Sequence, residues 1–444
     1  MKREILEKFN KKDSLLVISG YPRKRETYSK GVCAVSSFAK NTLLNLQKEN
    51  LDKKIVIFTM VTGKKEFYEE DEMLIIRCFK RNSPLSYLNL LSNILKFNKT
   101  KDILVEFEFA SFGNTLSTGL LLPLIWTLFL FRKNITLVMH QVLENIKELS
   151  GHIGVSKTNR KMAILNFSLK FFYKFLALPA KNIIVLEEEF KNRLGKITNS
   201  SKITVIAHGV DTNIKNVDRR VEREKLGIKE DEFVILYFGY LTWYKGVDFL
   251  IRALKDVRTI NNKKIKLIIA GGESFTQKEK RHYKIFISMI NNLLSKNGNV
   301  LRTGFVNEAN ITPVFEASDL IVLPYRTFMS SSGPMSLAIS HKKPFILSKN
   351  LEGLLNSFDI KQTMREAGLT KSDLVFDLNK KSLIKVIEKS LEPQLKQKML
   401  IFSKLLREQR SFANIAKIYS QLLFQPNNYL KTKAIYKIFS PNSN

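Results

Sequence analysis

The sequence predicts an α/β protein with two doubly wound domains, each a parallel sheet covered by helices, facing a central cleft. Short β-branched runs alternate with longer amphipathic stretches along the chain, a pattern typical of parallel sheets with helices on both faces. The 444 residues, 44% of them hydrophobic, exceed the length at which a single core stops growing. A polar stretch at residues 208–223 interrupts the alternation, which places a domain boundary near residue 210.

The apolar runs predict the individual elements. In the first half, strands are expected at residues 14–19, 55–60, 73–78, 102–107, 135–140 and 182–187, with helices at 32–50, 84–98 and 160–178. In the second half, strands are expected at 233–238, 265–270, 299–303, 319–323 and 345–348, with helices starting near residues 246, 276, 311, 334 and 380. Residues 1–209 and 210–410 are therefore expected to form the two domains.

Net charge, cysteine content and the N-terminal sequence limit the expected cellular compartment and the expected classes of binding partner. The formal net charge of +32 favours nucleic acid, anionic lipid headgroups or phosphorylated small molecules, but the spread of basic residues along the chain argues against nucleic acid. Cys33 and Cys78 lack the spacing of a disulfide framework, zinc site or redox pair, and the N-terminus lacks the order of a signal peptide, so we expect a cytoplasmic protein. The apolar stretch at 119–131 is shorter than the roughly 20 residues of a transmembrane helix, and it predicts a buried helix.

Ligands of open parallel sheets bind beyond the carboxyl ends of the strands, so the loops there hold the candidate site. The loop after the strand at 233–238 reads FGYLTWYKG and places Lys245 at the start of the next helix. A cation there opposes the positive end of the helix dipole, which favours a bound anion such as a diphosphate. The alternative is a lysine that points into water.

A second loop, at residues 325–334, reads YRTFMSSSGP and leads into a helix at Pro334. Its small residues let N–H groups and hydroxyls approach a phosphate, and the alternative is simple N-capping by Ser332. Arg326 either clamps a diphosphate or pairs with a carboxylate.

Three further positions are weaker candidates. Gly271 and Gly272 end the strand at 265–270, where they allow either a ligand's close approach or merely a tight turn. The basic loop at 20–31 ends at Gly31 and either is solvated or closes over a diphosphate. His140 ends its strand, so it either faces the interdomain cleft or is a buried histidine bonded to backbone.

Several other kinds of site lack their residues. The sequence has no G-x-G-x-x-G after a first strand, no P-loop and no H-E-x-x-H. It has no Asp-x-Asp pair to hold a divalent cation, and the acidic clusters at 69–72 and 230–232 are expected in solvent loops. We therefore expect no metal and no other cofactor, with phosphate charge met by Lys, Arg and helix ends.

Four pieces of the second half resemble the donor domain of the family-4 retaining glycosyltransferases. They are ILYFGYLTWYKGVDFLIRAL, LIIAGGE, TGFVNEANITPVFEASDLIVLPY and the Gly209-Val210-Asp211 linker, in the family's order over about residues 203–350. SFANIAKIYSQLL from Ser411 resembles the family's closing helix, which implies that residues 411–444 cross back to the first domain. The resemblance implies the GT-B fold and transfer of a hexosyl group, with retained configuration, from a nucleotide sugar to an acceptor hydroxyl.

The loops and the resemblance together give the expected site. The catalytic residues are His140 and Lys245, and the donor-binding residues are Gly31, Gly239, Tyr240, Lys245, Gly272, Tyr325, Arg326, Ser331, Ser332 and Gly333. Tyr240 stands where members usually carry an arginine, and Met329 and Leu337 occupy the places of two glutamates. The chain thus resembles a subset of the family that lacks the usual paired glutamates.

The expected partners are a nucleotide-sugar donor and a glycan or lipid-linked acceptor, with nucleic acid disfavoured. The helix at 160–178 mixes lysines with aromatics, which fits either an anionic membrane surface or core packing, so a peripheral position on the cytoplasmic face of the membrane stays open. Two other classes of protein are alternatives to a glycosyltransferase. The missing glutamates and the positive charge suggest a non-catalytic binder of sugar nucleotides or nucleic acid, whereas a sugar-nucleotide epimerase needs an acidic cluster in the cleft that is not evident.

Overall fold

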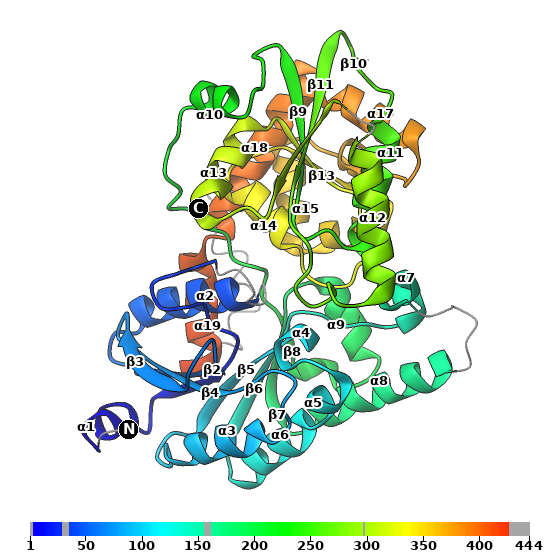
Figure 1. The fold of residues 1–444 in the computed structure, drawn as a ribbon. Coiled ribbons are helices and arrows are strands. Elements are labelled where there is room, and N and C mark those ends of the chain that lie inside the picture. The colour runs from blue at the N-terminus through cyan, green and yellow to red at the C-terminus, as the bar shows by residue number, and fades with distance from the viewer. Residues whose placement is uncertain (1–2, 29–34, 155–160, 296–297, 426–444) are drawn as a thin grey trace. The chain divides into compact units, whose positions relative to one another are not determined.

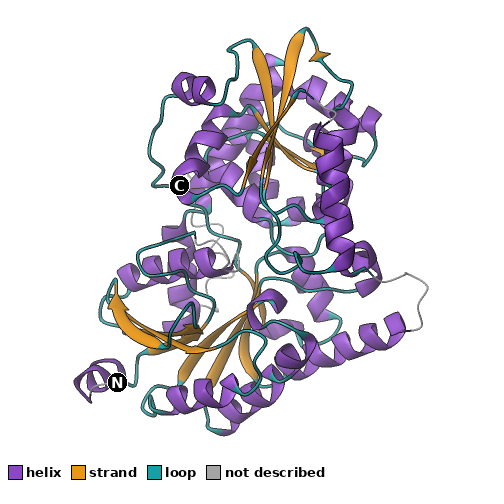
Figure 2. Cartoon of the chain, in the orientation of Figure 1, coloured by secondary structure: helices purple, strands orange, loops and turns teal. Residues whose placement is uncertain are grey.

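The computed structural model describes residues 3–28, 35–154, 161–295 and 298–425 (Figure 1). The chain folds as two units. Unit 1 comprises the described residues of 1–144, 163–209 and 412–444, and unit 2 those of 145–162 and 210–411. Each unit is a mainly parallel sheet with helices on both faces (Figure 2). The chain passes from one unit to the other at 209–210 and 411–412, and the excursion of residues 145–162 into unit 2 was not expected from the sequence.

Unit 1 is built on an eight-stranded sheet of order β3-β4-β2-β1-β5-β6-β7-β8. Its strands are β1 (Leu15–Ile18), β2 (Ile55–Met60), β3 (Glu66–Glu70), β4 (Met73–Phe79), β5 (Asp102–Phe107), β6 (Asn134–Met139), β7 (Ala180–Val185) and β8 (Ile203–Val205). All six predicted strands are confirmed, and β3 and β8 are additional. The prediction of a solvent loop at 69–72 was wrong for Glu69 and Glu70, which end β3, and Glu70 forms a 2.7 Å ion pair with Lys40. It is confirmed for Asp71 and Glu72, which are exposed in the turn before β4.

Helices cover both faces of this sheet. They are α1 (Arg3–Phe9), α2 (Val35–Glu49), α3 (Ser86–Leu95), α4 (Phe109–Phe112), α5 (Thr115–Gly119), α6 (Leu121–Leu130), α8 (Lys161–Ala177), α9 (Glu188–Gly195), α19 (Phe412–Phe424) and the 3₁₀ turn η2 (Ser200–Lys202). α19 packs beside α2 over one face, where Phe38, Tyr419 and alternate strand residues such as Val17 and Ile57 form the core. The closing segment of the chain therefore completes the first unit's core.

The apolar stretch at 119–131 forms a helix that is buried on one side alone. Leu121, Ile125 and Leu128 on α6 are fully buried, whereas Leu130 is 74% and Phe131 55% exposed. The prediction of a buried helix was therefore wrong for its outer side, because the helical period of 3.6 turns only one stripe toward the sheet.

Unit 2 is built on a seven-stranded sheet of order β10-β11-β9-β13-β14-β15, with β12 paired to β11. Its strands are β9 (Glu232–Phe238), β10 (Thr259–Ile260), β11 (Lys263–Ala270), β12 (Val300–Gly304), β13 (Leu320–Leu323), β14 (Phe345–Ser348) and β15 (Val375–Phe376). Its helices are η1 (Ile146–Leu149), α7 (Ser150–Ile153), α10 (Arg219–Lys225), η3 (Trp243–Lys245), α11 (Val247–Leu254), α12 (Arg281–Ser295), α13 (Glu308–Ala317), α14 (Gly333–Ser340), η4 (Lys349–Asn356), α15 (Phe358–Glu366), α16 (Lys371–Leu374), α17 (Lys380–Ser390) and α18 (Pro393–Gln409). The five predicted strands are confirmed, and the 230–232 cluster was wrongly placed wholly in a loop, since Glu232 begins β9.

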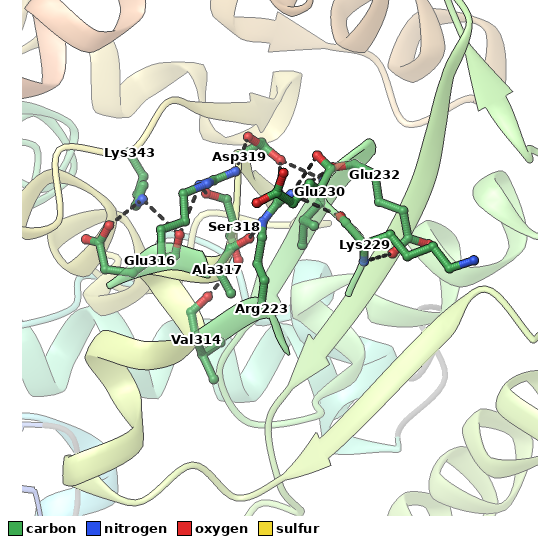
Figure 3. A network of polar contacts seen from close by, with 12 residues as sticks. Arg223, Lys229, Glu230, Glu232, Val314, Glu316, Ala317, Ser318, Asp319 and Lys343 are labelled. Carbon is green, nitrogen blue, oxygen red and sulfur yellow. Dashed lines mark hydrogen bonds and ion pairs between the residues drawn. The ribbon is translucent and has the colours of Figure 1, made fainter. Parts of the chain in front are cut away.

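The second half of the predicted linker is part of unit 2 rather than a solvated connection. α10 begins at Arg219, and the Arg223 side chain, only 4% exposed as a residue, donates to Asp319 at 2.6 Å and to the Ala317 carbonyl at 3.0 Å (Figure 3). Arg219 contacts the other oxygen of the same carboxylate at 2.6 Å. Removing one partner of such a buried pair costs about 3–5 kcal/mol. These contacts fasten α10 to the residue that precedes β13.

Candidate functional site

The loop after β9 carries the first group of predicted residues. Gly239 has φ 122° and donates its N–H to the Ala270 carbonyl at 2.9 Å, which turns the chain away from the sheet. Gly246, with φ 68°, joins η3 to α11, and a Cβ there would lie 1.9 Å from the Pro324 carbonyl oxygen. Only glycine tolerates both the left-handed backbone and this close approach. The start of α11 is therefore fixed against Pro324, the residue that follows β13.

Lys245 is folded back into the site. The residue is 9% exposed, and its Nζ lies 5.8 Å from the centre of the Tyr325 ring and 6.0 Å from that of Tyr244. A Cβ added to Gly239 would stand 2.7 Å from this Nζ and 3.5 Å from Pro334 Cγ. The alternative of a lysine pointing into water is therefore wrong. The ammonium lies where the two predicted loops meet.

The N-terminus of α14 forms the other side of this meeting point. Ser332 caps the helix, since its Oγ accepts the Met335 N–H at 3.3 Å, and the N-capping interpretation is confirmed. No atom of the described residues lies within 4 Å of the position that a Cβ of Gly333 would take. None of these residues therefore covers this side of the first turn of α14, where the helix dipole presents positive potential. Capping by Ser332 and anion binding by Ser331 and Gly333 are compatible.

Arg326 pairs with a carboxylate. Its guanidinium forks onto Asp248 with bonds of 2.8 and 2.7 Å, and Nη1 also donates to the Trp243 carbonyl at 2.6 Å. The Trp243 ring stacks below the same group at 5.2 Å. The interpretation of Arg326 as the partner of a carboxylate is confirmed, and a contact with the donor diphosphate stays a prediction. Through these bonds Arg326 braces η3 against the loop after β13.

Tyr325 and Tyr240 are placed differently from each other. Tyr325 is 3% exposed, its hydroxyl stands 3.5 Å from Ser332 Oγ, and burial raises its pKa well above the ordinary value. The Tyr325 hydroxyl is therefore neutral and lies beside the Ser332 hydroxyl at the start of α14. The Tyr240 ring packs against Phe275 and Phe305, with ring centres 6.1 and 6.2 Å apart, and its contact with a donor stays a prediction.

The two glycines after β11 serve backbone packing. A Cβ on Gly271 would fall 1.9 Å from the Gly239 carbonyl oxygen, and one on Gly272 would fall 3.0 Å from Phe305 Cβ. Leu241 N–H donates to the Gly272 carbonyl at 2.9 Å. The tight-turn interpretation explains both glycines, and a contact between Gly272 and a donor stays a prediction.

Residues 145–154 add side chains to unit 2 that sequence reasoning missed. The His152 ring stands edge-on to Tyr244 at 5.1 Å and 88°, and Gly151 lies so close to Trp243 that a Cβ would be 2.4 Å from its ring. Glu148 accepts a 3.0 Å bond from the Thr327 hydroxyl in the second loop. Burial, reinforced by nearby cations including Lys245, lowers the pKa of His152 to about 4. A neutral imidazole thus lies beside the lysine-bearing turn.

His140 belongs to unit 1 and contacts a buried acid. It is 5% exposed, and its Nε2 lies 2.5 Å from Oε2 of Glu106, which is fully buried near the end of β5. The Phe38 ring meets the imidazole edge-on at 4.8 Å. The interpretation of a histidine bonded to backbone was therefore wrong about its partner. Glu106 was missed, although a lone acid inside the apolar run ILVEF is a signal that could have found it.

Gly31, which was expected to bind the donor, lies outside the described residues. Within the described ranges, no group of three or more His, Cys, Asp or Glu side chains is arranged to hold a metal ion. None of the described helices is long and apolar enough to cross a membrane.

Comparison with known proteins places these features in a family context. Residues 218–363 match the family model described as glycosyl transferases group 1. Two uncharacterized glycosyltransferases of Methanocaldococcus jannaschii are similar: one is 28% identical over 150 residues (32% of this chain, 36% of the relative), the other 31% identical over 112 residues (24% and 26%). The chain thus spans about a third or less of these relatives' length. The matched region contains the Lys245 turn and the α14 loop.

Solved structures resemble nearly the whole chain. Sucrose-phosphate synthase from Thermosynechococcus elongatus superposes with a TM-score of 0.67 at 15% identity, covering 95% of this chain and 100% of that one. HepE of Anabaena, solved with UDP and glucose, gives 0.61 at 16% identity, covering 92% and 99%. WaaG, a glycosyltransferase involved in lipopolysaccharide biosynthesis, gives 0.61 at 12%, covering 93% and 100%. The fold is therefore GT-B, with two Rossmann-like domains, and the part of the chain that is similar to glycosyl transferases group 1 is residues 218–363.

Proposed function

We propose that this protein is a retaining hexosyltransferase that binds a nucleotide-sugar donor on unit 2 and passes the sugar to an acceptor hydroxyl. The observation that carries the proposal is the position of Lys245 Nζ, against Gly239 and beside the first turn of α14. The match of residues 218–363 to glycosyl transferases group 1 supports it. So does the likeness to HepE, which was solved with UDP and glucose.

The donor's diphosphate would be held by Lys245 and the start of α14. The ammonium is largely removed from water and lies over tyrosine rings, so its attraction for an anion is screened less than that of a surface lysine. Backbone N–H groups near Ser331 and Gly333 would add hydrogen bonds with the polarity of the helix dipole. Both interactions strengthen as the bond to the anomeric carbon breaks and negative charge builds on the leaving diphosphate, which lowers the barrier.

His140 is proposed to contact the reacting sugar. Glu106 fixes the orientation of the imidazole through the 2.5 Å contact with Nε2, and Phe38 supports the ring from the side. A fixed ring loses little conformational entropy when it meets a substrate hydroxyl. Glu106 is thus a positioning residue for His140.

The acceptor is proposed to be a glycan, glycolipid or lipid-linked sugar at the cytoplasmic side of a membrane. WaaG, which shares the fold, is involved in lipopolysaccharide biosynthesis. No tightly bound metal is needed in this scheme, because the sequence has no Asp-x-Asp pair and Lys245 meets the diphosphate charge. EDTA should therefore leave turnover intact, and a complete loss that Mg²⁺ or Mn²⁺ restores would contradict this part.

The proposal is tested by release of nucleoside diphosphate from a panel of UDP-, GDP-, ADP- and dTDP-sugars, with and without simple glycoside acceptors. Lys245→Met, which keeps the stem over the tyrosines, should lower turnover by roughly 100-fold or more. Lys255→Met, at the exposed end of α11, is the matched control and should leave it unchanged. Equal turnover of the two variants would refute the assignment of Lys245.

A further inference from the structure

One side of unit 1 carries a large apolar surface formed by α5, α6 and α8, which lie together in Figure 1. Its members are large hydrophobic side chains, each at least 37% exposed: Leu116, Leu120, Phe129, Leu130, Phe131, Ile164, Leu165, Phe167, Phe171 and Leu178. We call this set the α6–α8 surface. It holds more than half of the large exposed hydrophobic side chains in the described ranges, so it is a concentration rather than the ordinary scatter of a soluble surface.

Aromatic contacts make this surface continuous from one helix to the other. Phe171 stacks on Phe175 at 4.1 Å, Phe175 meets Trp126 at 6.4 Å, and Trp126 meets Phe129 at 6.0 Å. Trp126 Nε1 donates to the Phe175 carbonyl at 3.0 Å, so the indole's polar atom is satisfied inside the surface. The surface is therefore a fixed platform held by ring packing.

α8 is apolar on its outer as well as its inner side. Ile164, Phe167, Phe171 and Leu178 follow helical spacing along the outer side, and Phe167 is 72% exposed. The inner side packs on unit 1 through Leu169, Phe172, Tyr173 and Leu176. A helix that is hydrophobic all round normally has both sides covered. The described part of the chain covers only the inner one.

The charges around the surface indicate what covers it. Residues 109–186 contain nine Lys and Arg but only two acids, Glu144 and Glu148. Arg132, Lys170 and Lys174 are exposed on the helices or helix ends that carry the apolar side chains. A second copy packed on the same surface would bring these cations against one another. An anionic lipid headgroup layer over hydrocarbon complements both the cations and the aromatics.

We propose that the α6–α8 surface docks unit 1 on anionic lipid bilayers, with the aromatic and leucine side chains entering the interface and the cations meeting headgroup phosphates. This inference goes beyond the donor site, since it rests on unit 1 helices that carry no donor residue. It commits the chain to peripheral attachment by one amphipathic face, the arrangement expected where lysines flank exposed aromatics.

The test is cosedimentation of the full chain with vesicles of phosphatidylcholine alone and with 30 mol% phosphatidylglycerol. The wild type should bind the anionic vesicles at least about tenfold more strongly than the neutral ones, and 0.5 M NaCl should weaken that binding. Phe167→Ser with Phe171→Ser, and separately Lys170→Glu with Lys174→Glu, should each reduce partitioning about tenfold or more. The control is Ile285→Ser with Phe358→Ser on unit 2, whose side chains are similarly exposed at 63% and 45%.

The outcomes separate this proposal from its rivals and from the donor-site proposal. Equal vesicle binding by the control and the two surface variants would overturn the proposal. So would equal binding of the wild type to vesicles with and without phosphatidylglycerol. A wild type that ignores vesicles but dimerises through the surface, with dimers lost in Phe167→Ser/Phe171→Ser, would also overturn it. The charge-swapped lysines are exposed, so that variant tests the idea even if the phenylalanine variant misfolds. Lys245→Met should bind vesicles like wild type whether or not it transfers sugar.

Discussion

Substituting Gly246 by alanine should destabilise unit 2 strongly, because the donor-side loops depend on a close backbone approach there. A φ of 68° costs an alanine about 1–2 kcal/mol. Its Cβ would lie 1.9 Å from the Pro324 carbonyl oxygen, so the two loops would have to separate by roughly 1 Å. That separation would strain the 2.7 Å bond from Arg326 N–H to the Tyr244 carbonyl, a loss of about 1 kcal/mol. Together these terms give about 2–3 kcal/mol.

The measurement is the melting temperature of unit 2 by calorimetry. For a domain of about 200 residues, 2–3 kcal/mol corresponds to a decrease in melting temperature of roughly 4–12 °C. Gly333→Ala is the matched control, because its added Cβ would have no atom within 4 Å in the part of the chain that the structure describes. This variant should melt within about 3 °C of wild type. A Gly246→Ala protein that melts like wild type would refute the close approach on which the site geometry rests.

Three further predictions concern the titratable residues His152, Asp248 and Glu106. The pKa of His152 is about 4 in the folded state and about 6.5 in the unfolded state, so the unfolded state takes up the proton first as the pH falls. The stability from the neutral imidazole is complete above pH 6.5 and is lost as the pH falls toward 4, a loss of about 3 kcal/mol. Urea unfolding at pH 7 and pH 4 should show this loss in wild type and not in His152→Gln, and equal losses in both proteins would contradict the prediction. Asp248→Asn should lower the free energy of unfolding by about 2–3 kcal/mol, because it leaves Arg326 without its carboxylate partner. Denaturant unfolding would measure this loss. A loss below about 0.5 kcal/mol would show that the Arg326–Asp248 pair does not stabilise unit 2. Glu106→Gln should lower kcat about tenfold or more with the donor KM nearly unchanged, as a positioning role for His140 requires; a change in KM alone would count against that role.

The sequence predicted the interior of both sheets well because buried parallel strands are apolar runs. All eleven predicted strands exist, and the runs need no tertiary information to be recognised. The missed strands are short or polar edge pieces: β3 reads EFYEE, β8 contains three residues, and β10 and β15 each contain two. Such strands are defined by pairing with a neighbour rather than by their own composition. The same limit explains the outer side of α6, whose exposure depends on what packs against it.

The loops that hold the candidate site could be predicted from the sequence, but the contacts of their side chains could not. Strand ends converge in parallel sheets, so the loops holding Lys245 and Ser332 could be chosen from position alone. Which partner each side chain takes is a long-range property. Arg326 meets Asp248 across 78 positions and His140 meets Glu106 across 34, and neither pairing leaves a local pattern. The excursion of residues 145–162 into unit 2 is likewise set by packing and not by sequence periodicity.

The most direct test of the central claim is nucleotide binding at Lys245. Thermal-shift and calorimetric titrations of wild type, Lys245→Met and Lys255→Met against UDP, GDP, ADP and dTDP should identify a nucleotide that stabilises wild type by roughly 2.7 kcal/mol at 100 times its Kd. Lys245→Met should bind that nucleotide about tenfold or more weakly, since a charge-assisted hydrogen bond is lost, while Lys255→Met should match wild type. A wild type that binds none of the four, or a Lys245→Met protein that binds as well as wild type, would contradict the account.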